Sequence, residues 1–239
     1  VAHISAQQQA GNVQVLTLAQ AGEWFRKNYS VTPPTSVVAL DDWQEQGRKS
    51  VWYNSRFFRL NLVWQQDKIF VRDIHCFNEN VTSYTHSTAL AADFFVYETL
   101  PIMDSGQWSG NGGNSVGMWP VNATNGNTLT PQGLPVVKQL NPTDLSIVQS
   151  LSGGGAFSII CTEDNITCIG TNALGQSLNW AWNLVGGSQQ AAAVQNVNSN
   201  SVSYSYSGAN YQLRTTVGTC QELGNGDMAA ASPELAESR

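Results

Sequence analysis

Charged residues are unusually scarce in this sequence. Only 12% of its 239 residues are charged, against about 25% in a typical soluble domain. The 17 acidic and 11 basic side chains leave a net charge of −6, so the chain lacks the basic footprint that displaces counterions from nucleic acid. Ser, Thr, Asn, Gln and Gly supply its polarity instead, a pattern common in extracellular β proteins. We therefore predict an extracellular or periplasmic protein that does not bind nucleic acid.

Long apolar runs and a leader sequence are also missing. No stretch approaches the roughly 18 apolar residues that a membrane span needs, so no membrane partner is expected. The opening residues, VAHISAQQQAGN, have neither the basic nor the apolar region of a signal peptide. We expect that a leader has been removed or that the chain is a fragment of a longer polypeptide.

Histidine and cysteine are scarce, with three and four residues. None of them forms a CxxC or HxxxH pair, which argues against a zinc site, and no cofactor is expected. Four cysteines allow three pairings. The segment CTEDNITC places Cys161 and Cys168 symmetrically about a predicted hairpin turn, which favours a disulfide between them and leaves Cys76 and Cys220 as a second pair. The alternative is four buried free thiols.

What the chain does contain is strand patterning after one helix. Residues 13–30 read as a short strand and then a helix, with Thr17 and Gln20 in a capping box. From residue 36 the apolar positions mostly alternate, and Gly- and Asn-rich loops at 105–117 and 122–135 separate the runs. The expected strands are 36–43, 51–64, 69–77, 91–99, 116–121, 144–151, 156–162, 166–170, 177–185, 201–207 and 210–217.

This pattern predicts an all-β fold, an antiparallel β-sandwich preceded by one short N-terminal helix. We expect three parts along the chain: a strand–helix segment and linker at 1–35, the sandwich at 36–223, and a polar tail or linker at 224–239.

The segment VQVLTLAQAGEWFRKNYSVTPP, residues 13–34, resembles the last strand and helix of the barrel in glycan-active enzymes. In several such families a β-sandwich follows the barrel. The resemblance implies that an N-terminal catalytic domain belongs with this chain. It carries over no catalytic residue.

The stretch RDIHCFNE, residues 72–79, is the best candidate for an active site. It belongs to a predicted hairpin that turns at Gln66 and Asp67. In an uninterrupted register, Asp73 and His75 share one face with apolar residues. Arg59, Asn61 and Arg72 then lie on the other face.

Two interpretations of this stretch compete. In the first it is a polysaccharide lyase site, with His75 as base or orienting group and Glu79 or Tyr84 as proton donor. Arg59 or Arg72 would then hold the carboxylate of an acidic sugar, with Asn61 beside them. A glycoside hydrolase needs two carboxylates across a cleft, and no spacing singles out such a pair. In the second interpretation, Arg, Asp and His satisfy one another at the end of a strand, and exposure of His75 and Arg72 distinguishes the two.

Aromatic residues are the second candidate set, since sugars stack their apolar ring faces on Trp or Tyr. Trp108 lies in the glycine-rich segment SGQWSGNGG, where a core position is least expected. Trp180 and Trp182 share one face of a predicted strand and form either a stacking platform or part of the core.

Three functions remain open from the sequence. The first is an accessory β-sandwich of a larger glycan-active enzyme, which binds a polysaccharide or oligosaccharide or braces the barrel. The second is a catalytic lyase or glycoside hydrolase with its site around His75. The third is a structural or adhesive surface domain. The order of helix and sandwich favours the first, and the crowded polar residues of RDIHCFNE favour the second.

Overall fold

The computed structural model of the protein describes residues 2–77, 99–105, 117–122, 124–183, 193–206, 209–215, 221–224, 227–231 and 233–236. Its chain divides into two compact units, Val1–Pro33 and Pro34–Arg239. The first is helical, and the second contains every strand that the structure describes.

The N-terminal unit contains α1 (Ala2–Gln9) and α2 (Leu18–Asn28). The predicted capping box at the start of α2 is confirmed: the Gln20 backbone N–H donates to Thr17 Oγ1 at 3.3 Å, and the Thr17 N–H donates to Gln20 Oε1 at 2.9 Å. The short strand expected before α2 is wrong, because residues 13–17 pair with none of the described strands. Helix α1 was not predicted from the sequence, although its alanines and glutamines have good helix propensity.

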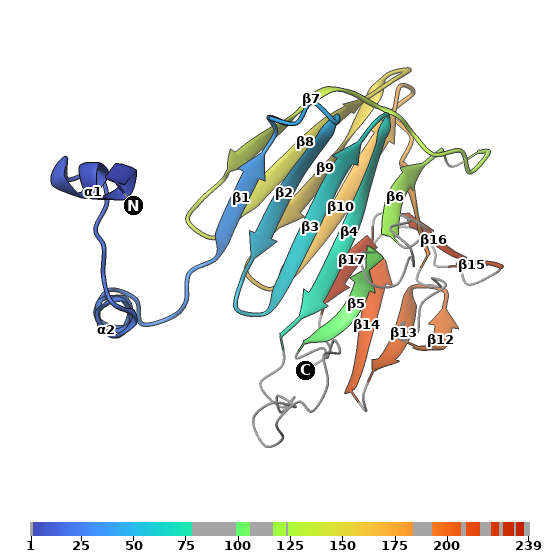
Figure 1. Ribbon diagram of the computed structural model, residues 1–239. Coiled ribbons are helices and arrows are strands. Elements are labelled where there is room, and N and C mark those ends of the chain that lie inside the picture. Colours follow the sequence, from blue (N-terminus) through green and yellow to red (C-terminus); the bar gives the residue numbers. More distant parts are fainter. Residues whose placement is uncertain are drawn as a thin grey trace, which may run out of the picture. The chain divides into compact units, whose positions relative to one another are not determined.

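The β unit consists of two antiparallel sheets (Figure 1), which confirms the predicted all-β sandwich after a short N-terminal helix. In spatial order, the first sheet contains β1 (Thr35–Ala39), β2 (Arg48–Asn54), β3 (Phe58–Gln65), β4 (Lys68–Cys76), β6 (Gly117–Val121), β11 (Asn179–Asn183), β16 (Asp227–Ala231) and β15 (Gln221–Gly224), with β5 (Leu100–Asp104) also paired to β4. The second sheet contains β12 (Ala193–Asn198), β13 (Ser201–Tyr206), β14 (Ala209–Thr215), β17 (Pro233–Ala236), β10 (Asn165–Asn172), β9 (Gly155–Cys161), β8 (Leu145–Leu151) and β7 (Pro131–Gln139).

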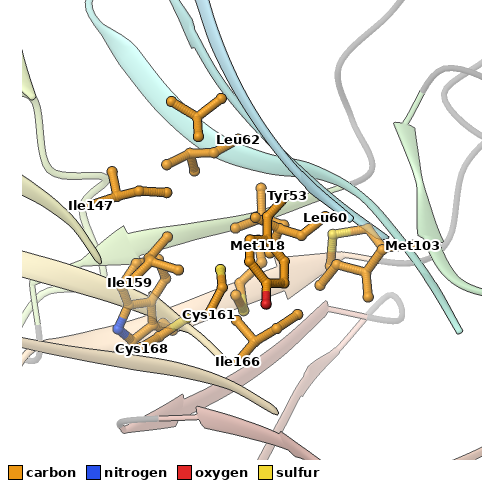
Figure 2. Packing of buried hydrophobic residues seen from close by; sticks show 14 of the residues in the cluster. Tyr53, Leu60, Leu62, Met103, Met118, Ile147, Ile159, Cys161, Ile166 and Cys168 are labelled. Atoms are coloured by element: carbon orange, nitrogen blue, oxygen red, sulfur yellow. The ribbon is translucent and has the colours of Figure 1, made fainter. Parts of the chain in front are cut away.

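The core lies between the two sheets. Because side chains alternate along a strand, every second residue of β3 and β9 points inward. Figure 2 shows Leu60 and Leu62 of the first sheet in one cluster with Ile147 and Ile159 of the second. Among the described residues, two buried aromatic donors also link the first sheet by hydrogen bonds to the second sheet and its β7–β8 loop. Trp64 Nε1 donates to Gln149 Oε1 at 2.8 Å, and Tyr53 Oη donates to the Thr143 carbonyl at 2.6 Å.

Several strands differ from the prediction. The single strand expected at 51–64 is two strands, because the Ser55 side chain accepts the Phe58 N–H at 3.1 Å and turns the chain between β2 and β3. Strand β7 occupies part of the predicted loop at 122–135, and the expected polar tail at 224–239 contributes β16 and β17. Pairing joins backbone groups, so a polar or irregular side-chain pattern does not prevent it.

The disulfide predicted between Cys161 and Cys168 is wrong. The turn lies one residue earlier than expected, so Cys161 pairs with Ile166 and Cys168 pairs with Ile159. Both cysteines point into the core as free thiols, which agrees with the alternative of buried thiols. The second predicted pair includes Cys220, which lies outside the described residues.

Candidate functional site

A β-bulge in β4 decides which side chains meet at the end of the β3–β4 hairpin. From the turn, the pairs run regularly to Leu62 opposite Val71, but the next pair is Asn61 opposite Asp73, which leaves Arg72 as the extra residue. The bulge exchanges the two faces of β4 beyond it. The predicted separation of Asp73 and His75 from Arg59 and Asn61 is therefore wrong, and all four share one face.

This face carries a cluster of two aspartates and a histidine, named here the Asp–His–Asp cluster (Asp73, His75 and Asp104). Asp104 of β5 pairs directly with Asp73 of β4. His75 Nε2 lies 3.3 Å from Asp104 Oδ2 and 3.6 Å from Asp73 Oδ2. The other ring nitrogen, Nδ1, contacts the hydroxyl of Thr99.

Arg59 and Asn61 border the cluster on β3. The Arg59 guanidinium donates to both oxygens of Asp73, with Nε–Oδ1 at 2.8 Å and Nη2–Oδ2 at 2.9 Å, a bidentate pairing that fixes the carboxylate. Asn61 Nδ2 donates to the Val51 carbonyl at 3.2 Å, whereas its side-chain oxygen is buried and accepts no hydrogen bond from the described part of the chain.

Burial sets what this cluster does chemically. His75 is 0% exposed, and Asp73 and Asp104 are each 6% exposed. A base in lyase chemistry must reach the proton that it abstracts, and an enclosed imidazole does not reach a polysaccharide. The arrangement therefore matches the second interpretation of RDIHCFNE, in which these groups interact with one another.

The other predicted site residues lie elsewhere or outside the described chain. Arg72 is half-buried at the bulge. Trp180 is 1% exposed and packs edge-on against Phe157 at a ring-centroid distance of 5.2 Å, so it is a core residue and does not stack on a sugar. Trp182 lies on β11, with its side chain outside the described part. Glu79, Tyr84 and Trp108 lie outside the described residues.

A pocket of about 250 Å³ lies at the turn end of the same hairpin. Its lining combines one indole with amides, a hydroxyl and an ammonium group: Gln65, Gln66, Lys68, Ile69, Phe70, Trp119 and Thr128. Such a mixture of apolar surface and a few polar groups is typical of ligand sites. This concave surface is suited to a sugar.

Strand β6 and the loop after it build one side of this pocket. Gly117 lets β6 pass close to β4, because an added Cβ atom would lie 3.1 Å from the Val71 carbonyl oxygen and 3.3 Å from the Phe70 ring. Met118 then points into the core, and Trp119 points to the opposite face, where it is half-buried. The loop returns through a bridge between Val121 and Thr128, which brings the Thr128 hydroxyl to the pocket.

Sequence reasoning missed Asp104 and Trp119. Asp104 stands at the start of a glycine-rich segment, where turn chemistry alone accounts for an aspartate, and only the pairing of β5 with β4 brings it next to His75. Trp119 lies in the expected strand 116–121, but nothing in that pattern distinguishes an outward-facing tryptophan from a core residue.

Comparison of the chain with protein families, with curated proteins and with solved structures finds no match. Among the described residues, neither helix is long and apolar enough to cross a membrane.

Proposed function

We propose that this chain is the accessory sugar-binding β-sandwich of a larger extracytoplasmic glycan-active enzyme. The observation that carries the proposal is the pocket at the β3–β4 turn, where a half-buried indole lies beside neutral hydrogen-bonding groups. The indole of Trp119 offers a flat apolar surface to a sugar ring. The amides of Gln65 and Gln66 and the hydroxyl of Thr128 both donate and accept hydrogen bonds, as sugar hydroxyls require.

The size and charge of the pocket narrow the ligand class. Its volume of about 250 Å³ lies below the roughly 300–1,000 Å³ of pockets that enclose a drug-sized ligand. It therefore suits the end or a short stretch of a glycan chain. Lys68 is the one charged side chain among its lining residues, so an acidic or sulfated sugar gains an ion pair there and a neutral sugar loses nothing.

The N-terminal unit supports attachment to a further domain. Helix α2 has no buried residue, and its Leu18 and Trp24 are 93% and 50% exposed. A helix of this length is marginal without tertiary packing, so these apolar side chains favour a neighbouring surface. The resemblance of residues 13–34 to the end of a barrel in glycan-active enzymes supports this through α2 alone, because the expected strand before the helix does not form.

The enclosed position of His75 argues against the catalytic alternative. No described feature favours the adhesive alternative over sugar binding.

The test is binding of the purified chain to a panel of neutral, uronic-acid and sulfated polysaccharides, followed by calorimetry with oligosaccharides of the best one. Trp119→Ala is expected to weaken binding at least about tenfold, which corresponds to about 1.4 kcal/mol. The matched control is Trp43→Ala, because Trp43 is 87% exposed and does not line the pocket. Equal affinity of wild type and Trp119→Ala, or no binding to any glycan, would contradict the proposal.

A parallel assay of the same polysaccharides separates binding from catalysis. It records unsaturated products and reducing ends, with His75→Ala beside the wild type. We expect no product from either protein. Product formed by the wild type and lost in His75→Ala would establish the lyase or hydrolase alternative.

A further inference from the structure

The Asp–His–Asp cluster has a geometry that the sugar-binding role does not use. We propose that Asp73, His75 and Asp104 bind a divalent transition-metal cation, of which Zn²⁺ and Mn²⁺ are the best fit. The proposal is independent of the sugar-binding function, because the pocket residues and the cluster residues are different side chains.

The spacing of the three ligand atoms is the first argument. One atom from each residue lies within 4.8 Å of the other two, and His75 Nε2 lies 3.3 and 3.6 Å from the two carboxylate oxygens. Metal–nitrogen and metal–oxygen bonds of about 2.0–2.2 Å place neighbouring ligands of a tetrahedral ion roughly 3.3–3.6 Å apart. A charge-assisted hydrogen bond of an imidazolium to a carboxylate would be about 2.7–2.9 Å. The observed separations match ligands around a common ion better than a direct ion pair.

The groups behind the cluster are the second argument. Metal-binding histidines and carboxylates are usually held by outer hydrogen bonds. Here Thr99 contacts His75 Nδ1, and Arg59 donates two hydrogen bonds to Asp73. With the Nδ1–H donating to Thr99, the neutral imidazole presents its Nε2 lone pair to the space between the carboxylates.

Asn61 provides an independent observation. Its side-chain oxygen is fully buried and accepts no hydrogen bond from any residue that the structure describes, and a buried polar atom without a partner destabilises the folded state. Asn61 pairs directly with Asp73 across the bulge, so the two side chains neighbour each other on the same face. A cation in the cluster gives this oxygen a partner as a fourth ligand.

The donor set indicates which metal. One imidazole nitrogen with carboxylate and amide oxygens suits Zn²⁺ or Mn²⁺, whereas Ca²⁺ prefers six to eight oxygen ligands. Two carboxylates so close together repel each other when both are ionised, and a divalent cation removes that repulsion. Since the ligands come from β4 and β5 and are enclosed, the ion would hold these two strands together rather than act on a substrate.

The experiment uses the full chain after removal of metal with a chelator. Thermal unfolding is recorded without metal and with Zn²⁺ or Mn²⁺, and affinity is measured by calorimetry. At a metal concentration about 100 times Kd, we expect the melting temperature to rise by about 5–10 °C. Asp104→Asn keeps the shape of the side chain and removes the charge, so its affinity should fall at least about tenfold. Glu163→Gln, which alters a half-buried carboxylate outside the cluster that pairs with Arg56, should respond as the wild type does.

A second variant keeps the test decisive if Asp104→Asn does not fold. Thr99→Val retains the side-chain shape and removes the contact to His75 Nδ1, so metal affinity should fall about tenfold through the outer shell. Cobalt(II) substitution adds a spectroscopic readout, because the visible absorption of the bound ion should change in Thr99→Val and stay the same in Glu163→Gln. If neither metal raises the melting temperature, or all variants respond as the wild type does, the proposal is overturned and the cluster is a closed polar network.

Discussion

Both faces of the first sheet are buried along β3 and β4, but one face buries apolar side chains and the other buries polar and charged side chains. On the core face, Leu60, Leu62 and Ile74 are at most 1% exposed and contact apolar residues of the second sheet. On the opposite face, Asn61 and His75 are both 0% exposed, yet this face holds an ion pair and a polar cluster. Burial alone therefore does not indicate what a face is made of.

The bulge at Arg72 is what keeps these two chemistries apart. Without the extra residue, Asp73 and His75 would turn into the apolar core, and Ile74 would turn outward. One inserted residue, Arg72, therefore determines which side chains of β4 face the core and which face the polar cluster. The experiments below test it, from the largest expected effect to the smallest.

Deletion of Arg72 should have the largest effect. The deletion removes the bulge, so either Asp73 and His75 or the facing residues Asn61 and Arg59 turn into the apolar core. Unpaired charges buried there strongly destabilise the folded state. We expect loss of the cooperative unfolding transition, measured by urea denaturation. Arg72→Ala is the matched control, since it keeps the extra residue and shortens only a half-buried side chain. It should change the free energy of unfolding by less than about 1 kcal/mol, and equal behaviour of the two variants would show that the bulge does not sort the faces.

Leu62→Ala should break the core face alone. The side chain is 0% exposed and lies in the inter-sheet cluster. Truncation leaves a cavity that the two sheets do not fill, so we expect a loss of about 2–5 kcal/mol in the free energy of unfolding. Urea denaturation measures it, and a loss below 1 kcal/mol would mean that the sheets close over the gap. Metal affinity in the cluster should not change.

Arg59→Ala should weaken the polar face without touching the core. It leaves Asp73 without its bidentate partner, and a buried pair that loses one member costs about 3–5 kcal/mol. Because the Arg59 side chain is 33% exposed, solvent screening reduces this to about 2 kcal/mol. The matched comparison is Glu163→Gln, which breaks the pair with Arg56, where both side chains are at least 31% exposed, and should cost less than about 1 kcal/mol. Similar losses in these two variants would refute a buried role for the Arg59–Asp73 pair.

The pH dependence of stability should show how strongly the apolar core disfavours the ionised form of the Cys161 thiol. Burial raises the pKa of Cys161 to about 12 from a reference value of 9.0, since the thiolate is disfavoured in an apolar environment. The folded state therefore holds the proton more tightly than the unfolded state. The contribution of the protonated Cys161 thiol to the free energy of unfolding is complete below pH 9 and is lost as the pH rises from about 9 to 12. At pH 10 the loss is about 1.4 kcal/mol for this thiol.

The measurement is the free energy of unfolding against pH for the wild type and Cys161→Ala. The difference between the two curves should be flat below pH 9 and slope downward above it. A difference that stays flat up to pH 11 would mean that this thiol ionises in the folded protein as readily as in the unfolded chain.

The same hairpin shows how far sequence reasoning reaches. The turn position and the first four pairs from Gln65 to Leu62 could be read from the alternation of apolar residues, and they are correct. Beyond Leu62 the predicted register is wrong, because neither the bulge at Arg72 nor the one at Ile102 between β4 and β5 leaves a mark in residue types. Arg59, Asn61 and His75 were therefore chosen as site residues but placed on two faces instead of one.

The sequence by itself determined the classes of structure in this protein. The capping box at Thr17 and Gln20 determined where α2 begins, since it depends on residues three positions apart, and the period-two pattern determined an antiparallel sandwich. The tertiary structure alone decided which polar residues meet. Asp104 lies beside His75 only because β5 pairs with β4. Trp119 lines the same pocket as Gln65 only because strand pairing and the Val121–Thr128 bridge bring distant segments together. The physical reason is that local patterns record which face of a strand is apolar, whereas register, bulges and strand order depend on backbone pairing with the rest of the chain.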